Sequence, residues 1–323
     1  MGASAAKAVD HAAKLPGPLA VVWGGPGRRR LVALLLAAVG LIAAGQWAWR
    51  KWGEAAAHGR DFQVAPSRIE VTPQPDWIRA EVKTEALEQA SIQMLNLRDP
   101  QLVERVQRAF SMHPWVAKVT SVRKRFPAQV TVELEYRRPV AMVEVVKAGG
   151  QPALVFLDAD SVLLPDEDFR PPENLAEKDA LLFSAQIAKR YLRIHSPAAS
   201  PAGRMVGSPW GSEAIAGAAK LAGVWGDQWQ SLGLYRILVA ADQNALPLYE
   251  LQTENQTHVV WGHAPGAETK DEPLARDKIV WLRQYVVQKG PLDKSAKGIE
   301  LDLRQKDGKP PEHTAREGRK ATR

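Results

Sequence analysis

The chain has 323 residues, of which 45% are hydrophobic and 24% charged, which is ordinary for globular protein and enough for one large or two small domains. It contains no cysteine, which excludes disulfides and thiolate metal sites. The net charge of +7 lies at the ends, because residues 1–60 carry +6 and residues 306–323 carry +3, whereas residues 61–305 carry −2. This near-neutral body argues against a nucleic-acid-binding surface, and we expect no nucleic-acid partner.

Residues 31–49, LVALLLAAVGLIAAGQWAW, predict a transmembrane helix. Nineteen residues at about 1.5 Å each nearly match a hydrocarbon core of about 30 Å, and tryptophans cluster at the C-terminal end. Arg28–Arg30 favour a cytoplasmic N-terminus, with residues 1–30 as a cytoplasmic tail and the bulk of the chain outside the cytoplasm. The alternative is a signal peptide cleaved after the small residues Ala55–Ala57.

Residues 62–137 predict the order β-α-α-β-β. Alternating apolar residues indicate strands at 68–73, 116–125 and 129–136, and helical spacing indicates helices at 76–90 and 99–110. Asp99 is a candidate N-cap for the second helix, with Pro100 at its first position. The basic run Arg123–Arg125 lies on a strand and points to alternating faces, so it indicates a solvated strand with Glu133 and Glu135 opposite rather than one basic stripe.

Three stretches of this segment are distinctive: His113-Pro114-Trp115-Val116, Arg125-Phe126-Pro127 and Arg137-Arg138-Pro139-Val140-Ala141. Their residues and order resemble the FtsQ/DivIB family of bacterial cell-division proteins. Tyr136-Arg137 and Thr72-Pro73 depart from the family pattern. The resemblance implies a POTRA domain at 62–137, with motif positions Pro114, Trp115, Val116, Arg125, Pro127 and Pro139.

Residues 138–305 predict a second domain of strands with flanking helices. We expect strand, turn and strand over 153–165, a partly helical segment at 172–192, a helix at 212–225 and a strand at 235–239. Residues 248–253 and 257–261 predict a hairpin, residues 271–288 a helix and residues 298–304 a closing strand. The proline-containing residues 306–323 predict a disordered basic tail.

This order also resembles the C-terminal β domain of the same family. The matching stretches are Val260-Trp261-Gly262, followed by Lys278 and Leu282, and Leu301-Asp302-Leu303-Arg304. The resulting fold class is α+β: an N-terminal transmembrane helix, a POTRA domain, and a mixed or antiparallel β domain. The resemblance implies a non-enzymatic scaffold of the bacterial inner membrane that recruits division proteins of the FtsB/FtsL/DivIC type. It implies that a partner adds a strand near Ile299, Leu301, Leu303, Arg304 and Trp261.

Two other functions remain open from the sequence. Asp158 and Asp160 follow an apolar strand, as in phosphohydrolases that use an Asp-x-Asp pair, so a membrane-anchored envelope enzyme is one alternative. A POTRA-type translocation or chaperone component is the other. His258 and His263 lack a common zinc spacing, and we expect no metal, cofactor or small-molecule substrate.

Overall fold

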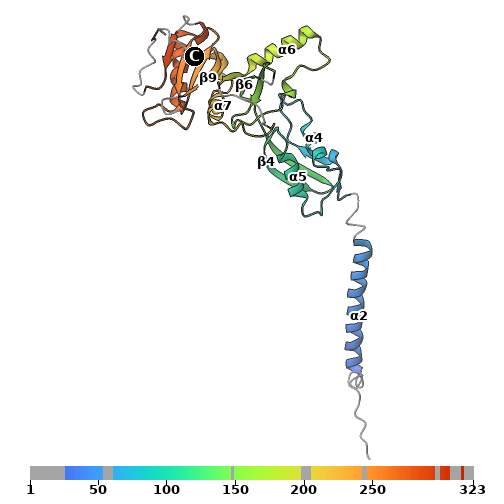
Figure 1. Ribbon diagram of the computed structural model, residues 1–323. Coiled ribbons are helices and arrows are strands. Elements are labelled where there is room, and N and C mark those ends of the chain that lie inside the picture. The colour runs from blue at the N-terminus through green and yellow to red at the C-terminus, as the bar shows by residue number, and fades with distance from the viewer. Residues whose placement is uncertain are drawn as a thin grey trace, which may run out of the picture. The chain divides into compact units, whose positions relative to one another are not determined.

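We analysed a computed structural model that describes residues 26–53, 61–146, 149–197, 205–241, 246–294, 299–305 and 314–315. The chain divides into two compact units, Met1–Gln63 and Val64–Arg323. It is a mixed α+β protein with one long apolar helix near the N-terminus (Figure 1). Most of the predicted N-terminal and C-terminal tails lies outside the described residues.

The N-terminal unit contains helix α2 (Pro26–Ala48), followed by a π-helical turn at Trp49–Gly53. The helix begins before the predicted residue 31, because Pro26 is suited to a first helical position. Within Arg30–Lys51 it is long and apolar enough to cross a membrane, and its apolar side chains are exposed. Such a helix is compatible with a single membrane anchor or with a signal sequence.

The N-terminal module (residues 64–136) has the predicted β-α-α-β-β order. Its elements are β2 (Ile69–Val71), α4 (Val82–Gln89), α5 (Leu102–Ser111), β4 (Val116–Arg125) and β5 (Gln129–Tyr136), together with the two-residue strands β1 (Gln63–Val64) and β3 (Leu95–Asn96). The three main strands are ordered β2-β5-β4, with β2 parallel and β4 antiparallel to β5. The inward residues Val130, Val132 and Leu134 are buried, as their alternation predicts.

Both predicted helices of this module begin later than expected. Backbone groups at 78–80 bond to side chains instead, since the Gln74 amide donates to the carbonyls of Ile78 and Ala80, and Asp168 accepts from the amides of Arg79 and Ala80. Helix α4 therefore begins at Val82. Helix α5 begins at Leu102.

The C-terminal module (residues 137–315) is built on one mixed sheet. Its strands are β6 (Ala141–Val146), β7 (Pro152–Leu157), β8 (Leu192–His195), β9 (Leu234–Ala241), β10 (Pro247–Thr253), β11 (His258–Gly262), β12 (Ile299–Asp302) and β13 (Thr314–Ala315). They are ordered β13-β12-β11-β10-β9-β8-β6-β7. The β6–β8, β8–β9 and β11–β12 pairs are parallel and the others are antiparallel, so the sheet is mixed.

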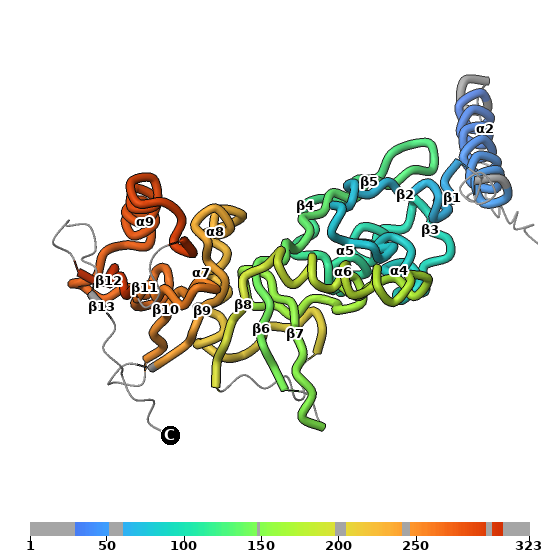
Figure 2. The backbone as a smooth tube through the Cα atoms, turned by 90° about the horizontal axis from the view of Figure 1, so that it is seen from above, coloured from blue at the N-terminus to red at the C-terminus, as the bar shows by residue number. Residues whose placement is uncertain are grey.

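The described part of this module contains four α-helices: α6 (Glu177–Arg190), α7 (Glu213–Trp225), α8 (Gln228–Ser231) and α9 (Ala275–Lys289). Figure 2 shows α7, α8 and α9 along the same side of the sheet. The core beneath them contains Trp225, Trp261 and Leu282, all buried. The short strand β8 was not predicted, because it follows α6 with no turn residue between them.

A second apolar cluster joins the two modules. Successive residues of β6 and β7 point to opposite faces, so Ala141 and Leu157 enter the core under α7, whereas Met142 and Phe156 pack with the N-terminal module. Phe156 stacks on Phe169 with 3.6 Å between ring centroids. The division predicted between residues 137 and 138 is therefore crossed by one continuous core.

Candidate partner-binding site

The predicted partner-binding residues gather at one end of the sheet. Leu301, Leu303 and Trp261 are buried, because their side chains fill the core beneath α9. Ile299 is half-buried. A partner could therefore reach the main chain of β12 but not these three side chains.

The far edge of β12 carries its own strand. On one side β12 pairs with β11, and on the other Ile299 and Glu300 pair antiparallel with Ala315 and Thr314 of β13. Thr314 and Ala315 lie within residues 306–323, which we predicted to be a disordered tail, and here they form a short strand instead. The edge of β12 would otherwise carry unpaired backbone groups, and a nearby segment of chain can pair with them. The rest of that tail lies outside the described residues.

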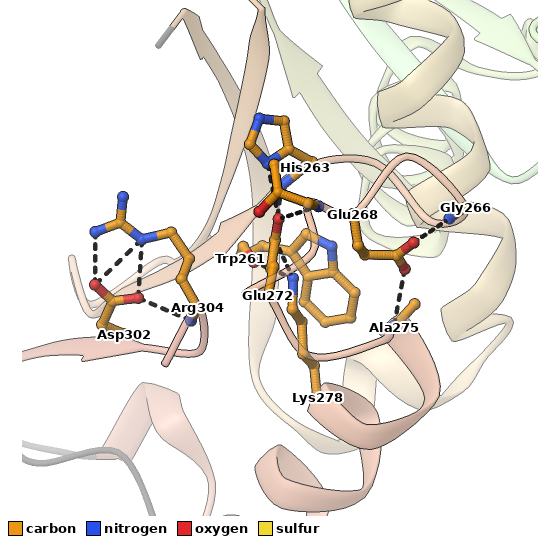
Figure 3. Close-up of polar contacts among 10 residues, drawn as sticks. Trp261, His263, Gly266, Glu268, Glu272, Ala275, Lys278, Asp302 and Arg304 are labelled. Carbon is orange, nitrogen blue, oxygen red and sulfur yellow. Dashed lines mark hydrogen bonds and ion pairs between the residues drawn. The ribbon is translucent and has the colours of Figure 1, made fainter. Parts of the chain in front are cut away.

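The side chain of Arg304 is exposed but is held by Asp302. Its Nη2 lies 2.6 Å and its Nε 3.0 Å from the Asp302 carboxylate, and its backbone amide also donates to that group at 2.9 Å (Figure 3). Burial alone would raise the pKa of Asp302, but the hydrogen bonds from Arg304 outweigh it and hold the pKa below its ordinary value. The pair presents a guanidinium whose charge is already compensated.

Behind the end of β11 lies a buried ion pair. Lys278 of α9 is completely buried, and its Nζ donates to the carboxylate of Glu272 and, at 2.6 Å, to the backbone carbonyl of Trp261 (Figure 3). The same ammonium lies 4.9 Å from the centroid of the Trp261 ring. A buried charge requires such partners, so this lysine fixes the geometry of the strand end.

Glu272 gathers several further donors. It accepts from the His263 amide at 2.9 Å, from His263 Nδ1 at 2.7 Å and from the Thr269 amide at 3.3 Å. Burial alone would raise the pKa of Glu272, but the hydrogen bonds from Lys278 and His263 hold the pKa below its ordinary value. Helix α9 was predicted from residue 271 but begins at Ala275. Glu272 lies before the helix, where it binds Lys278 and His263, and Glu268 accepts a hydrogen bond from the amide of Ala275, the first helical residue.

Gly262 permits this arrangement by having no side chain. Its φ of +98° suits glycine, and a Cβ added there would lie 2.0 Å from Glu272 Oε1. We expect Gly262→Ala to lower the free energy of unfolding by about 3 kcal/mol, because it adds backbone strain and displaces a buried carboxylate. Urea unfolding of the full chain in detergent micelles measures this.

The matched control is Gly290→Ala. Gly290 also has a left-handed φ, +88°, but nothing lies within 4 Å of its added Cβ. This control should cost only about 1 kcal/mol, which isolates the strain from the clash. Equal losses for the two variants would contradict a steric role for Gly262.

The motif residues of the N-terminal module lie mainly in its core and turns. Trp115 and Val116 are buried where β4 begins, and Pro139 is buried in the link to β6. Pro127 lies in the β4–β5 turn, and Arg125, the last residue of β4, is exposed. The structure brings Trp115 to Asp168 of the C-terminal module, with a distance of 2.6 Å between the indole nitrogen and Oδ2. Val116 and Arg125 lie in β4, which belongs to the three-stranded sheet and not to the sheet that contains β12.

The basic run on β4 is used within the fold. Arg123 lies 3.4 Å from the Glu133 carboxylate across the hairpin, as predicted. Lys124 donates to the carbonyls of Leu97 and Asp99 on the other face. The cluster therefore divides between two faces and does not form a single basic stripe.

The carboxylate of Asp158 is fully engaged in a turn. Its Oδ2 lies 2.7 Å from Arg137 Nη1, and its Oδ1 accepts from the amides of Asp160 and Val162 at 3.0 and 2.8 Å. Asp158 is only 4% exposed, whereas Asp160 is exposed. The two carboxylates thus do not converge on a common open position, and Asp158 has the environment of a structural residue.

We expect Asp158→Asn to lower the free energy of unfolding by about 2 kcal/mol, because it removes the charge that pairs with the half-buried Arg137. Urea unfolding of the full chain in micelles measures the loss, and an assay with p-nitrophenyl phosphate should show the same background for both proteins. Unchanged stability combined with loss of a measurable phosphatase activity would favour the enzyme alternative.

The two histidines considered for metal binding have separate partners. His258 contacts Gln252 and Glu250, whereas His263 contacts Glu272. Within the described ranges, no group of three or more metal-ligating side chains is placed to hold an ion.

Neither a scan against protein-family models nor a search of curated proteins found a match to this chain. The functional assignment therefore depends on the residues and their arrangement.

The residues missed by the sequence reasoning are Asp168 and Glu272. Each is a carboxylate whose partners come from distant or irregular segments, so no periodic pattern marks it. Lys278 did carry a signal, since an ionisable residue on the apolar side of a helical pattern calls for a buried partner. Glu268, Asp271, Glu272 and Asp277 all lie within ten residues of Lys278, so the sequence alone does not single out Glu272.

Proposed function

We propose that this protein is a membrane-anchored, non-enzymatic scaffold of the bacterial division machinery, similar to the FtsQ/DivIB family. The observation that carries the proposal is the order of parts: an apolar N-terminal helix, a β-α-α-β-β module, and a mixed sheet ending in an edge strand. We take the first module as a POTRA domain. The helix would hold both modules outside the cytoplasm, at the inner membrane.

The proposed mechanism is recruitment through backbone pairing at β12. The buried core side chains Leu301 and Leu303 stiffen the strand, and the Lys278–Glu272 pair fixes the neighbouring end of β11. A partner of the FtsB/FtsL/DivIC type would add its own strand to this edge and displace β13, which pairs through only two residues. Main-chain bonds would supply affinity, and the exposed side chains around the edge would supply specificity.

The engagement of Asp158 supports the scaffold over the envelope enzyme. A nucleophilic carboxylate needs an open face toward its substrate, and this one is filled by Arg137 and two backbone amides. A translocation component usually repeats its POTRA unit, and the sequence shows no repeat.

The test is depletion of the protein in its own bacterium, combined with imaging of a fluorescent fusion. We expect filamentous cells on depletion and a band of fluorescence at the division site. Uniform membrane fluorescence together with normal septation would overturn the proposal.

A further inference from the structure

A cavity of about 340 Å³ lies between the two modules, away from the β12 edge. Four segments line it: the turn before α4, the link between β5 and β6, the junction of α6 with β8, and the turn after α7 together with α8. Its size is at the lower end for small-ligand sites, which typically measure about 300–1,000 Å³. A group of one or two amino-acid side chains would fill it.

Aromatic side chains form the buried part of this cavity. Trp229 and Tyr191 are only 7% and 8% exposed. The Tyr191 ring is held edge-on against Phe156 and Phe169, with centroid distances of 5.7 and 5.9 Å. Its hydroxyl has no hydrogen-bond partner among the residues that the structure describes, although it belongs to a side chain more than nine-tenths buried. The hydroxyl oxygen is not among the side-chain atoms that are sealed from solvent without a partner, so it opens into the cavity, where a ligand can supply an acceptor in place of water.

The rim of the cavity carries an excess of one positive charge. Arg138 binds both carboxylate oxygens of Asp227, at 2.9 and 2.8 Å, and these two charges cancel. Arg190 lines the same cavity and makes no ion pair within the described part of the chain. Burial raises the pKa of Tyr191, while the nearby guanidinium groups of Arg190 and Arg138 oppose that rise. The hydroxyl therefore stays protonated at neutral pH, as a donor beside an uncompensated cation.

We propose that this cavity binds an acidic peptide segment, with a carboxylate accepting hydrogen bonds from Arg190 and Tyr191 and an adjacent aromatic or apolar side chain lying against Trp229 and Trp77. A single surplus guanidinium matches a monoanion, and guanidinium–carboxylate bonds are among the stronger hydrogen bonds in proteins. The rim is open, since the side chains of Arg138 and Asp227 are 57% and 87% exposed, so a peptide can continue out on either side. This inference does not depend on the proposed division function.

The test uses the full chain in detergent micelles, with its tryptophan indoles labelled with ¹⁵N. The probe is N-acetyl-phenylalanyl-glutamate amide, and its analogue with glutamine in place of glutamate is the control. We expect saturable shifts of the Trp77 and Trp229 signals, assigned from Trp77→Phe and Trp229→Phe, with a Kd of about 1 mM or tighter. The glutamine analogue should bind about tenfold more weakly.

Variants locate the contacts. Arg190→Gln and Tyr191→Phe should each weaken binding about tenfold, and the second keeps the ring packing and therefore the fold. Lys189→Gln makes the same charge change one residue away, outside the cavity lining, and should alter binding less than about twofold. Asp227→Asn should strengthen binding, because it frees Arg138.

Three outcomes would overturn the proposal. The first is the absence of saturable shifts up to about 20 mM probe, well above the expected Kd. The second is equal binding of the glutamine analogue. The third is equal weakening by Arg190→Gln and Lys189→Gln, which would indicate general attraction to positive charge.

Discussion

Replacing Asp168 with alanine should lower the free energy of unfolding by about 3–5 kcal/mol, because it removes the acceptor from three donors that bond to no other group among the described residues. The carboxylate accepts from the amides of Arg79 and Ala80, at 2.7 and 2.8 Å, and from the Trp115 indole at 2.6 Å. Trp115 is completely buried, so water cannot replace the lost bond. Urea unfolding of the full chain in micelles, followed by circular dichroism, measures the change.

Two further variants make this result specific. Asp168→Asn keeps an acceptor oxygen but turns an amide nitrogen toward one of the donors, so its loss should be about half that of alanine. Asp160→Ala, at an exposed aspartate eight positions earlier, should change stability by less than about 0.5 kcal/mol. If Asp168→Ala and Asp160→Ala unfold at the same urea concentration, the proposed role of Asp168 is wrong.

The second large effect concerns the buried ion pair. Lys278→Met should lower the free energy of unfolding by about 3–5 kcal/mol at pH 7, because it leaves the Glu272 carboxylate buried without its cation. The double variant Lys278→Met/Glu272→Gln should recover part of this loss, since it contains no buried charge. Lys289→Met, at an exposed lysine of the same helix, should cost less than about 1 kcal/mol.

The pH dependence follows from the lowered pKa of Glu272. A carboxyl whose pKa is lower in the folded chain contributes stability that is complete above its ordinary value of 4.5 and is lost as the pH falls through the folded value. In Lys278→Met only the hydrogen bonds from His263 still oppose burial, so the pKa of Glu272 rises relative to the parent chain and the variant takes up a proton earlier on acidification. Its deficit should therefore be smaller at pH 5 than at pH 7. A deficit independent of pH would show that lost packing, rather than the bare carboxylate, causes it.

Much of the fold was predictable because the spacing of apolar residues along the chain marks its strands and helices. The alternation in 129–136 correctly predicts both the strand β5 and its buried face, and the hairpin β10–β11 lies where the apolar runs flank 254–256. The helices begin late at α4 and α9, because side chains from elsewhere take the backbone groups of their first turns. Strand β8 was missed because it follows α6 with no turn residue between them, so the sequence does not separate the strand from the helix.

The site was predictable only in part, for a related reason. The pattern of 299–303 correctly indicates the closing strand β12, but alternation alone does not show how deeply Leu301 and Leu303 are buried. The partner of Trp115 lies 53 residues away in an irregular segment, and periodicity carries no information about such pairs. The cavity between the modules likewise depends on four segments that meet only in the folded chain.

The shared apolar cluster between the modules has a mechanical consequence. Met142 and Phe156 sit in the N-terminal module's core although their strands belong to the sheet, and Asp168 ties the sheet module to Trp115. A force applied to β12 would therefore act on this shared cluster, and the two modules would rotate together before they separated. Force applied at the β12 end of the sheet would be transmitted to the N-terminal module through packed side chains rather than through a flexible linker.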